Sequence, residues 1–222
     1  MMEYRTKEEQ VADYLREGII SGKYPRGSRL KQAEIAEQLR LSITPVREAL
    51  KLLAAEGYVD GDSYKGTRVT TFDPAASAET LNLRMILESQ LVRAAVDNMT
   101  ASDLRAIKEL ADEFEAAILA GDRGVARGVN YRLHRRLYDV AKLPQTLHFV
   151  QILWAKYPFD VINAEGNRGE HAVEEHKEIL TALVNGDATT AMLAMRRHIE
   201  SGWEVLKADS AKVTSVPVGV GS

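Results

Sequence analysis

The chain has 222 residues, of which 45% are hydrophobic and 27% are charged, and it contains no cysteine. This length and composition can bury a small and a larger core, so we expect two domains. Without cysteine the chain has no disulfides and no thiolate metal sites, which leaves histidine, carboxylate and amide groups as metal ligands. No apolar run approaches the ~20 residues that cross a bilayer, and the N-terminus lacks the apolar core of a signal peptide. We therefore expect a cytoplasmic protein with no membrane partner.

The net charge of −3 hides a basic segment. Between Ser21 and Lys51, seven basic side chains stand against three acidic ones. Such a segment suits the phosphate backbone of a nucleic acid, although a charged cluster by itself is more often a solvated face.

The first helix is expected at residues 7–21. Thr6 and Glu9 match a capping box, and apolar residues then recur at helical spacing until Gly22. A Pro/Gly turn follows, and apolar residues at 35–39 indicate a second, short helix.

The third helix is expected within LSITPVREALKLLAAEGYV, residues 41–59. Ser42 is placed to cap its first turn with a side-chain oxygen, Pro45 lies where a missing N–H breaks no helical bond, and Gly57 ends the helix. On a helical wheel, the core face holds Val46, Ala49, Leu50 and Leu53, and the polar face holds Thr44, Arg47, Glu48 and Lys51.

After Gly57, the segment YVDGDSYKGTRVTTF contains two short β-prone runs around a glycine-containing loop. Three helices followed by a hairpin make a winged helix-turn-helix, which places the N-terminal turn of its third helix in the major groove of DNA. Thr44 and Arg47 would then project from a rigid helix tip toward base edges and phosphates.

The segment GKYPRGSRLKQAEIAEQLRLSITPVREALKLLAAEGYVDGDSYKGTRV resembles the DNA-binding domain of the GntR family of bacterial transcription regulators, because TPVREAL, EGYV and KGTRV occur in order. The resemblance implies DNA contacts from the third helix and the wing tip, through Ser42, Thr44, Arg47, Lys65 and Gly66. We add Lys51 because it lies on the same polar face of the third helix. Two residues depart from the family pattern. Ile43 stands where an arginine is usual and Arg40 where a glycine is usual, so we expect base reading or the share of phosphate contacts to differ.

The rest of the chain is expected to form an antiparallel all-helical bundle, which makes the fold mainly α. Its six helices are expected at 74–99, 101–120, 123–141, 144–158, 168–185 and 187–208. We divide the chain into a winged helix-turn-helix domain at 1–72, a helical effector-binding and dimerisation domain at 73–209, and a flexible tail at 210–222. The bundle resembles the FCD ligand-binding domain of the FadR branch, and six helices rather than seven resemble its VanR-like subgroup.

Three histidines are predicted to meet inside the bundle. Asn130 and His134 lie four residues apart on one helix, and His176 and His198 belong to the last two helices, so these side chains can converge on one interior point. The FCD pattern has an acidic residue and three histidines at these places, which implies a divalent metal such as Zn²⁺ or Ni²⁺. Asn130 replaces the usual aspartate, and a neutral amide is expected to weaken metal binding. The alternative is a polar pocket in which the same histidines bind an organic anion directly.

Arg84 matches an arginine near the family's ligand pocket. The resemblance implies that its guanidinium clamps the carboxylate of an effector in two hydrogen bonds. The alternative is an ion pair with Glu88, four residues later in the same helix.

These features predict a transcription regulator that is not an enzyme. We expect a homodimer that represses from a palindromic operator in double-stranded DNA and is modulated by a small carboxylic acid, through a hinge near Thr71 to Pro74. A metal-dependent hydrolase that uses the three-histidine site is the alternative from another class, although the sequence has no HExxH, Gly-x-Ser-x-Gly or phosphate loop. The third interpretation is a nucleoid-type protein that binds DNA without sequence preference.

Overall fold

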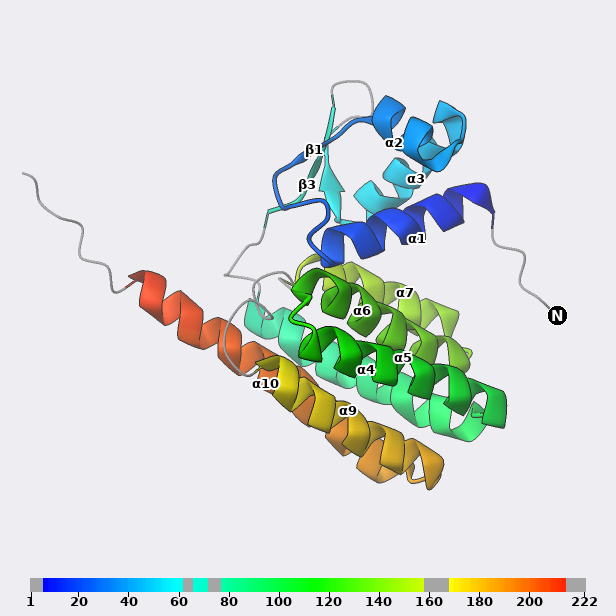
Figure 1. Ribbon diagram of the computed structural model, residues 1–222, viewed down its shortest axis with the longest axis vertical. Helices are drawn as coiled ribbons and strands as arrows, with labels where there is room; N and C mark the ends of the chain where they lie inside the picture. The colour runs from blue at the N-terminus through cyan, green and yellow to red at the C-terminus, as the bar shows by residue number, and fades with distance from the viewer. Residues whose placement is uncertain (1–5, 62–65, 72–76, 158–167, 215–222) are drawn as a thin grey trace, which may run out of the picture.

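The computed structural model describes residues 6–61, 66–71, 77–157 and 168–214, and the fold is mainly helical, as the sequence predicts. We call residues 6–71 the head and the helices after residue 76 the bundle. The head contains α1 (Lys7–Ile20), β1 (Arg29–Leu30), α2 (Gln32–Leu39), α3 (Ile43–Glu56), β2 (Val59–Asp60) and β3 (Thr67–Val69). In Figure 1 the head lies above the bundle, and α1 is the head helix nearest to it.

Local signals set the ends of the head's helices. The Glu9 N–H donates to Thr6 Oγ1 at 3.3 Å, and the Glu9 carboxylate accepts from the Thr6 N–H at 2.8 Å, which completes the predicted capping box of α1. Gly57 ends α3 with φ +86°, a conformation that costs glycine little because it has no Cβ. Ser42 occupies the N-cap position of α3, but the expectation that its oxygen caps the helix was wrong. Its side chain makes no capping hydrogen bond, so the backbone alone begins the helix.

The wing is a three-stranded antiparallel sheet with strand order β1-β3-β2. The predicted hairpin of β2 and β3 is present, with Val59 opposite Val69. We did not expect β1, because its two residues lie inside the Pro/Gly segment and pair with a strand that comes much later in the chain. Residues 62–65, including Lys65, lie outside the described residues.

Six helices follow among the described residues: α4 (Ser77–Asn98), α5 (Ala101–Leu119), α6 (Arg123–Val140), α7 (Pro144–Ala155), α9 (Arg168–Val184) and α10 (Ala188–Thr214). Thr100 caps α5 in a capping box with Asp103, as expected. Helix α10 passes residue 208 because no glycine or proline follows Gly202 until Pro217. The expected tail at 210–222 therefore begins within a helix. Residues 215–222 and most of the expected hinge lie outside the described part of the chain.

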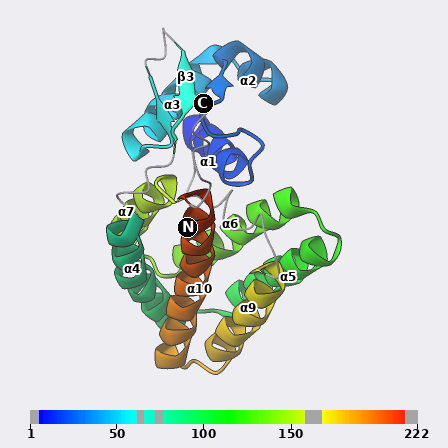
Figure 2. The same cartoon turned by 90° about the vertical axis from the view of Figure 1, so that its left-hand side faces the viewer.

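Helix α1 connects the head to the bundle. It packs against α3 within the head and against α6 of the bundle, and α3 also contacts α7. Figure 2 shows α10 between α4 and α9. Buried side chains of the head and the bundle, such as Leu15 and Leu137, belong to one continuous core. Among the described helices, none combines the length and apolar composition that crossing a membrane requires.

Candidate functional site

The N-terminal turn of α3 is an exposed tip on a buried base. The apolar face of the helix is buried in the head, whereas its first residues are all exposed: Ser42, Ile43 and Thr44. Arg47 is half-buried one turn later. Lys51 is exposed, and its Nζ lies 2.9 Å from Glu48 Oε1 on the same face. The predicted residues of the third helix are therefore exposed or half-buried.

The head also carries basic residues that we did not assign to the DNA-binding surface. Arg29 and Arg68 are exposed and lie opposite each other on β1 and β3. Gly66 has φ +108° and lies against Arg29, since a Cβ on Gly66 would be 2.9 Å from the Arg29 guanidinium. Arg40 ends α2 with φ +54°, in the left-handed region that favours glycine. The basic segment of the sequence contains Arg29 and Arg40, but only the strand pairing brings Arg29 beside Arg68.

The structure brings the three predicted histidines together, one each from α6, α9 and α10. His134, His176 and His198 are 5%, 2% and 8% exposed, and one ring nitrogen of each lies within 4.8 Å of the others. His134 Nε2 and His198 Nε2 are 3.1 Å apart. The ring centroid of His176 is 4.7 Å from that of His198 and 5.5 Å from that of His134.

Two carboxylates orient two of these rings. His198 Nδ1 lies 2.7 Å from Glu175 Oε2, so this nitrogen carries the hydrogen and Nε2 keeps its lone pair. The Tyr138 hydroxyl donates to Glu88 Oε2 at 2.7 Å, which leaves its oxygen to accept from His134 Nδ1 at 3.3 Å. Each Nε2 atom then keeps a free lone pair, and the two atoms are neighbours. Two nitrogens that bind one zinc ion at ~2.1 Å are about 3.0–3.4 Å apart, so the observed 3.1 Å fits a shared cation.

The three imidazoles are neutral at neutral pH. Burial, together with His198, lowers the pKa of His134 and of His176 well below the usual range. Burial also lowers the pKa of His198, although the hydrogen bond with Glu175 opposes this. Partial burial acts to raise the pKa of Glu175, but its bonds to His198 and Arg168 lower that pKa to about 2. Neutral imidazole is the form that binds metal ions.

A cavity of about 30 Å³ opens beside His134 and His198. Within the bundle it is lined by Arg84, Asn130, Tyr131, His134, Trp154 and His198. Asn130 Oδ1 and both ring nitrogens of His176 are buried and have no hydrogen-bond partner among the described residues. Buried polar atoms without partners are rare in native proteins, so these groups fit a ligand or a cation. The described lining contains no carboxylate.

Arg84 is held in place by Glu88. Its Nε donates to Glu88 Oε1 at 2.6 Å, and both side chains are buried. Its guanidinium also lies 4.1 Å from the centroid of the Tyr157 ring. The ion pair that was the alternative to a ligand contact is therefore present. Because Arg84 also lines the cavity, the two roles do not exclude each other.

Comparison with known proteins covers both parts of the chain. Residues 7–69 match the model of the bacterial regulatory proteins of the gntR family, and residues 79–201 match that of the FCD domain. The chain is 31% identical over 197 residues to the "Probable D-xylose utilization operon transcriptional repressor" of Paenarthrobacter nicotinovorans, covering 86% of this chain and 84% of that protein. It is 30% identical over 180 residues to the HTH-type transcriptional regulator McbR of Escherichia coli (strain K12), covering 78% and 80%.

A solved structure shares the fold. E. coli McbR/YncC matches with a TM-score of 0.80 and 24% sequence identity, over 93% of this chain and 100% of that one. These matches give the hydrolase alternative no support. The chain therefore belongs to the GntR family of bacterial transcription regulators, with a C-terminal FCD domain, and it is a DNA-binding regulator and not an enzyme.

Proposed function

We propose that the protein is a dimeric repressor that responds to a small organic acid bound beside a metal ion in the FCD domain. One observation carries the proposal: the same chain presents an exposed helix tip on a winged head and three buried histidines beside a small cavity. The tip suits duplex DNA, and the cavity suits a small ligand. The division into domains at 1–72 and 73–209 belongs to the same proposal.

The head would bind one half-site of the operator. Its contacts would come from α3 and the wing: Ser42, Thr44, Arg47, Lys51, Lys65 and Gly66. Thr44 and Arg47 supply hydrogen-bonding groups for base edges, and the exposed Lys51 ammonium suits a phosphate. Because one head covers one half-site, specific binding requires two heads about 34 Å apart.

Exposed apolar side chains support a homodimer. Leu83 and Ile86 on α4 are 40% and 57% exposed, and Phe149 on α7 is 57% exposed. Helices α4 and α7 pack against each other, so a second copy seated on these two helices would shield apolar surface from water.

The histidine site is proposed to hold Zn²⁺ or Ni²⁺ through His134, His176 and His198, with Asn130 as a weak further ligand. A divalent ion there would supply a positive charge that attracts a carboxylate. Neutral imidazoles and an amide offer no negative charge to balance it, which favours an anionic effector, and Arg84 adds a second cationic contact beside the cavity.

Selection of sequences from random duplex DNA tests the DNA-binding part. We expect a palindrome whose half-site centres are about 10 base pairs apart. Affinity for the selected and for random DNA is then compared at one salt concentration, because salt changes both. Equal affinity would contradict the proposal and favour a nucleoid-type protein.

Elemental analysis of protein purified without added metal, followed by zinc titration, tests the metal part. His176→Ala is expected to abolish zinc binding, whereas His171→Ala, at an exposed position of the same helix, is the matched control. Asn130→Asp should tighten zinc binding because it adds a negative charge to the site. A metal-free protein that also fails to bind added zinc would favour direct binding of an organic anion by the histidines.

A further inference from the structure

A residue of the head lines the cavity beside the histidines. Ile20, the last residue of α1, is 5% exposed and lines the cavity together with His134, His198, Asn130 and Arg84. The other lining residues that the structure describes come from the bundle. A site in the FCD domain is thus completed by the DNA-binding domain.

Hydrogen bonds hold the head on the bundle beside Ile20. Arg127 of α6 donates from Nε and Nη2 to the carbonyl oxygen of Ser21, which directly follows α1, at 3.0 and 2.7 Å. Gly128 allows α1 and α6 to approach closely, since a Cβ there would lie 3.2 Å from Glu17 Oε1. Both residues belong to α6, the helix that also carries Asn130. Helix α6 therefore both contacts the head and forms part of the cavity wall.

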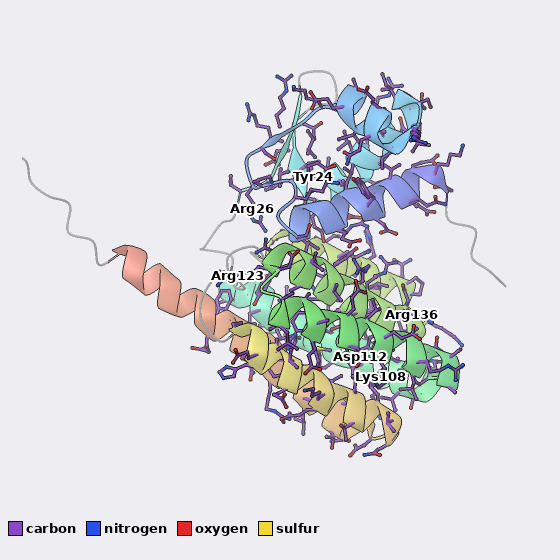
Figure 3. All side chains as sticks on the ribbon, viewed as in Figure 1. Tyr24, Arg26, Lys108, Asp112, Arg123 and Arg136 are labelled. Carbon is purple, nitrogen blue, oxygen red and sulfur yellow. The ribbon has the colours of Figure 1, made fainter. Side chains whose placement is uncertain are left out.

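A second contact links the head to this cavity. Arg26 lies where the head meets the bundle (Figure 3), and its Nη2 donates to the Tyr157 carbonyl oxygen at 2.8 Å. The Tyr157 ring covers Arg84, whose guanidinium lines the cavity. The head thus reaches the site through the end of α1 and through the loop after it.

The size of the cavity determines whether a ligand can enter without moving a wall residue. About 30 Å³ holds one or two water molecules and is too small for a carboxylate with its carbon chain. Protein interiors are close-packed, so the bundle walls yield only at a cost in free energy. We propose that Ile20 sets the size of the acid that the site accepts, and that a larger acid displaces the docked head. This inference rests on the proposed function, because it takes the cavity to be the effector site.

Head docking and acid binding would then compete for one volume. By linkage, each weakens the other by the same factor. An acid that fits without moving Ile20 would bind without changing the position of the head, because a ligand shifts an equilibrium only by its preference for one state.

The test compares the wild type with Ile20→Ala, Ile20→Val and the control Ile19→Ala. Ile19 is the neighbouring residue, is 6% exposed, and does not line the cavity. Protein loaded with Co²⁺ is titrated with formate, acetate, propionate and butyrate, and the visible spectrum of Co²⁺ reports entry of the carboxylate. The melting temperature is followed in the same titrations with and without metal.

We expect affinity to fall with chain length in the wild type and in Ile19→Ala. Ile20→Ala should bind butyrate about tenfold more tightly than the wild type, with Ile20→Val between them, because removing methyl and methylene groups from a wall makes room for those of the ligand. Equal affinity for butyrate in all four proteins would overturn the inference.

Hydrogen exchange of the amides at residues 15–25 reports the position of the head directly. Saturating butyrate should accelerate exchange there in the wild type and leave it unchanged in Ile20→Ala, where the acid fits beside a docked head. Unchanged exchange in the saturated wild type would also overturn the inference.

Failure of the inference can be told apart from failure of the proposed function. If acids bind with the same size dependence in all variants, Ile20 is not the limit, but the effector site stands. If no acid changes the spectrum or the melting temperature of any variant, the effector part of the proposed function and the inference both fall. Selection of an operator, measured separately, would still support the DNA-binding part.

Discussion

Replacing His176 by leucine is expected to stabilise the metal-free protein and to abolish zinc binding. The His176 side chain is 2% exposed, and neither ring nitrogen has a hydrogen-bond partner among the described residues. A neutral imidazole has one donor and one acceptor, and leaving buried polar groups unpaired costs about 1–3 kcal/mol. The ring edge also packs on Phe114, with centroids 4.8 Å apart, so an apolar side chain of similar size suits the place.

Thermal unfolding in the presence and absence of a chelator measures this effect. With the chelator, His176→Leu should melt higher, by about 2–4 °C for each kcal/mol gained. With zinc at about a thousand times its Kd, the wild type gains about 4.1 kcal/mol and the variant gains nothing. This gain exceeds the advantage of about 1–3 kcal/mol that the variant has without metal, so the order of stability reverses. His171→Leu, exposed on the same helix, should leave both measurements unchanged. A variant that melts lower than the wild type with the chelator, or that gains equally from zinc, would refute the reasoning.

Three further predictions concern the head. Arg47→Ala should weaken binding to the selected operator by about 1–3 kcal/mol in a titration at fixed salt, and an unchanged affinity and footprint would remove Arg47 from the site. Ile43 is 49% exposed at the tip and should contact a thymine methyl group. Replacing that thymine with uracil should therefore weaken the wild type but not Ile43→Ala, and equal losses would reject the contact. Arg40→Gly should raise the free energy of unfolding by about 1–2 kcal/mol, because Arg40 has φ +54°, which costs glycine less than arginine. Urea denaturation measures this free energy, and no increase would mean that the backbone at Arg40 is not strained.

Local signals made much of the fold predictable. The pairs Thr6–Glu9 and Thr100–Asp103 form capping boxes because residues three apart meet at the start of a helix, whatever the rest of the chain does. Strand β1 could not be predicted in this way, because its pairing depends on β3, which is distant in sequence. The side chain of Ser42 shows the limit of local rules, since a capping residue at the right place makes no capping bond.

The candidate site was predictable to a smaller extent. The places of the three histidines followed from their helices and from the family pattern, and Tyr138, four residues after His134, follows the same helical period. Glu175 and Glu88 gave no signal in the sequence for their part in orienting the rings. The contact of Ile20 with the cavity had none either, because it depends on how two domains dock.

The contribution of Ile20 to the cavity wall affects how this regulator can be recombined with others. A chimaera that joins a foreign head at the linker after residue 71 would place an unrelated side chain over His134 and His198, which leaves either a hole or a clash in the recipient bundle. Helix α1 cannot be left behind with the bundle, because it packs against α3 and Arg16 pairs with the buried Glu56 of that helix. A working exchange would therefore move the whole head and restore isoleucine at the end of its first helix.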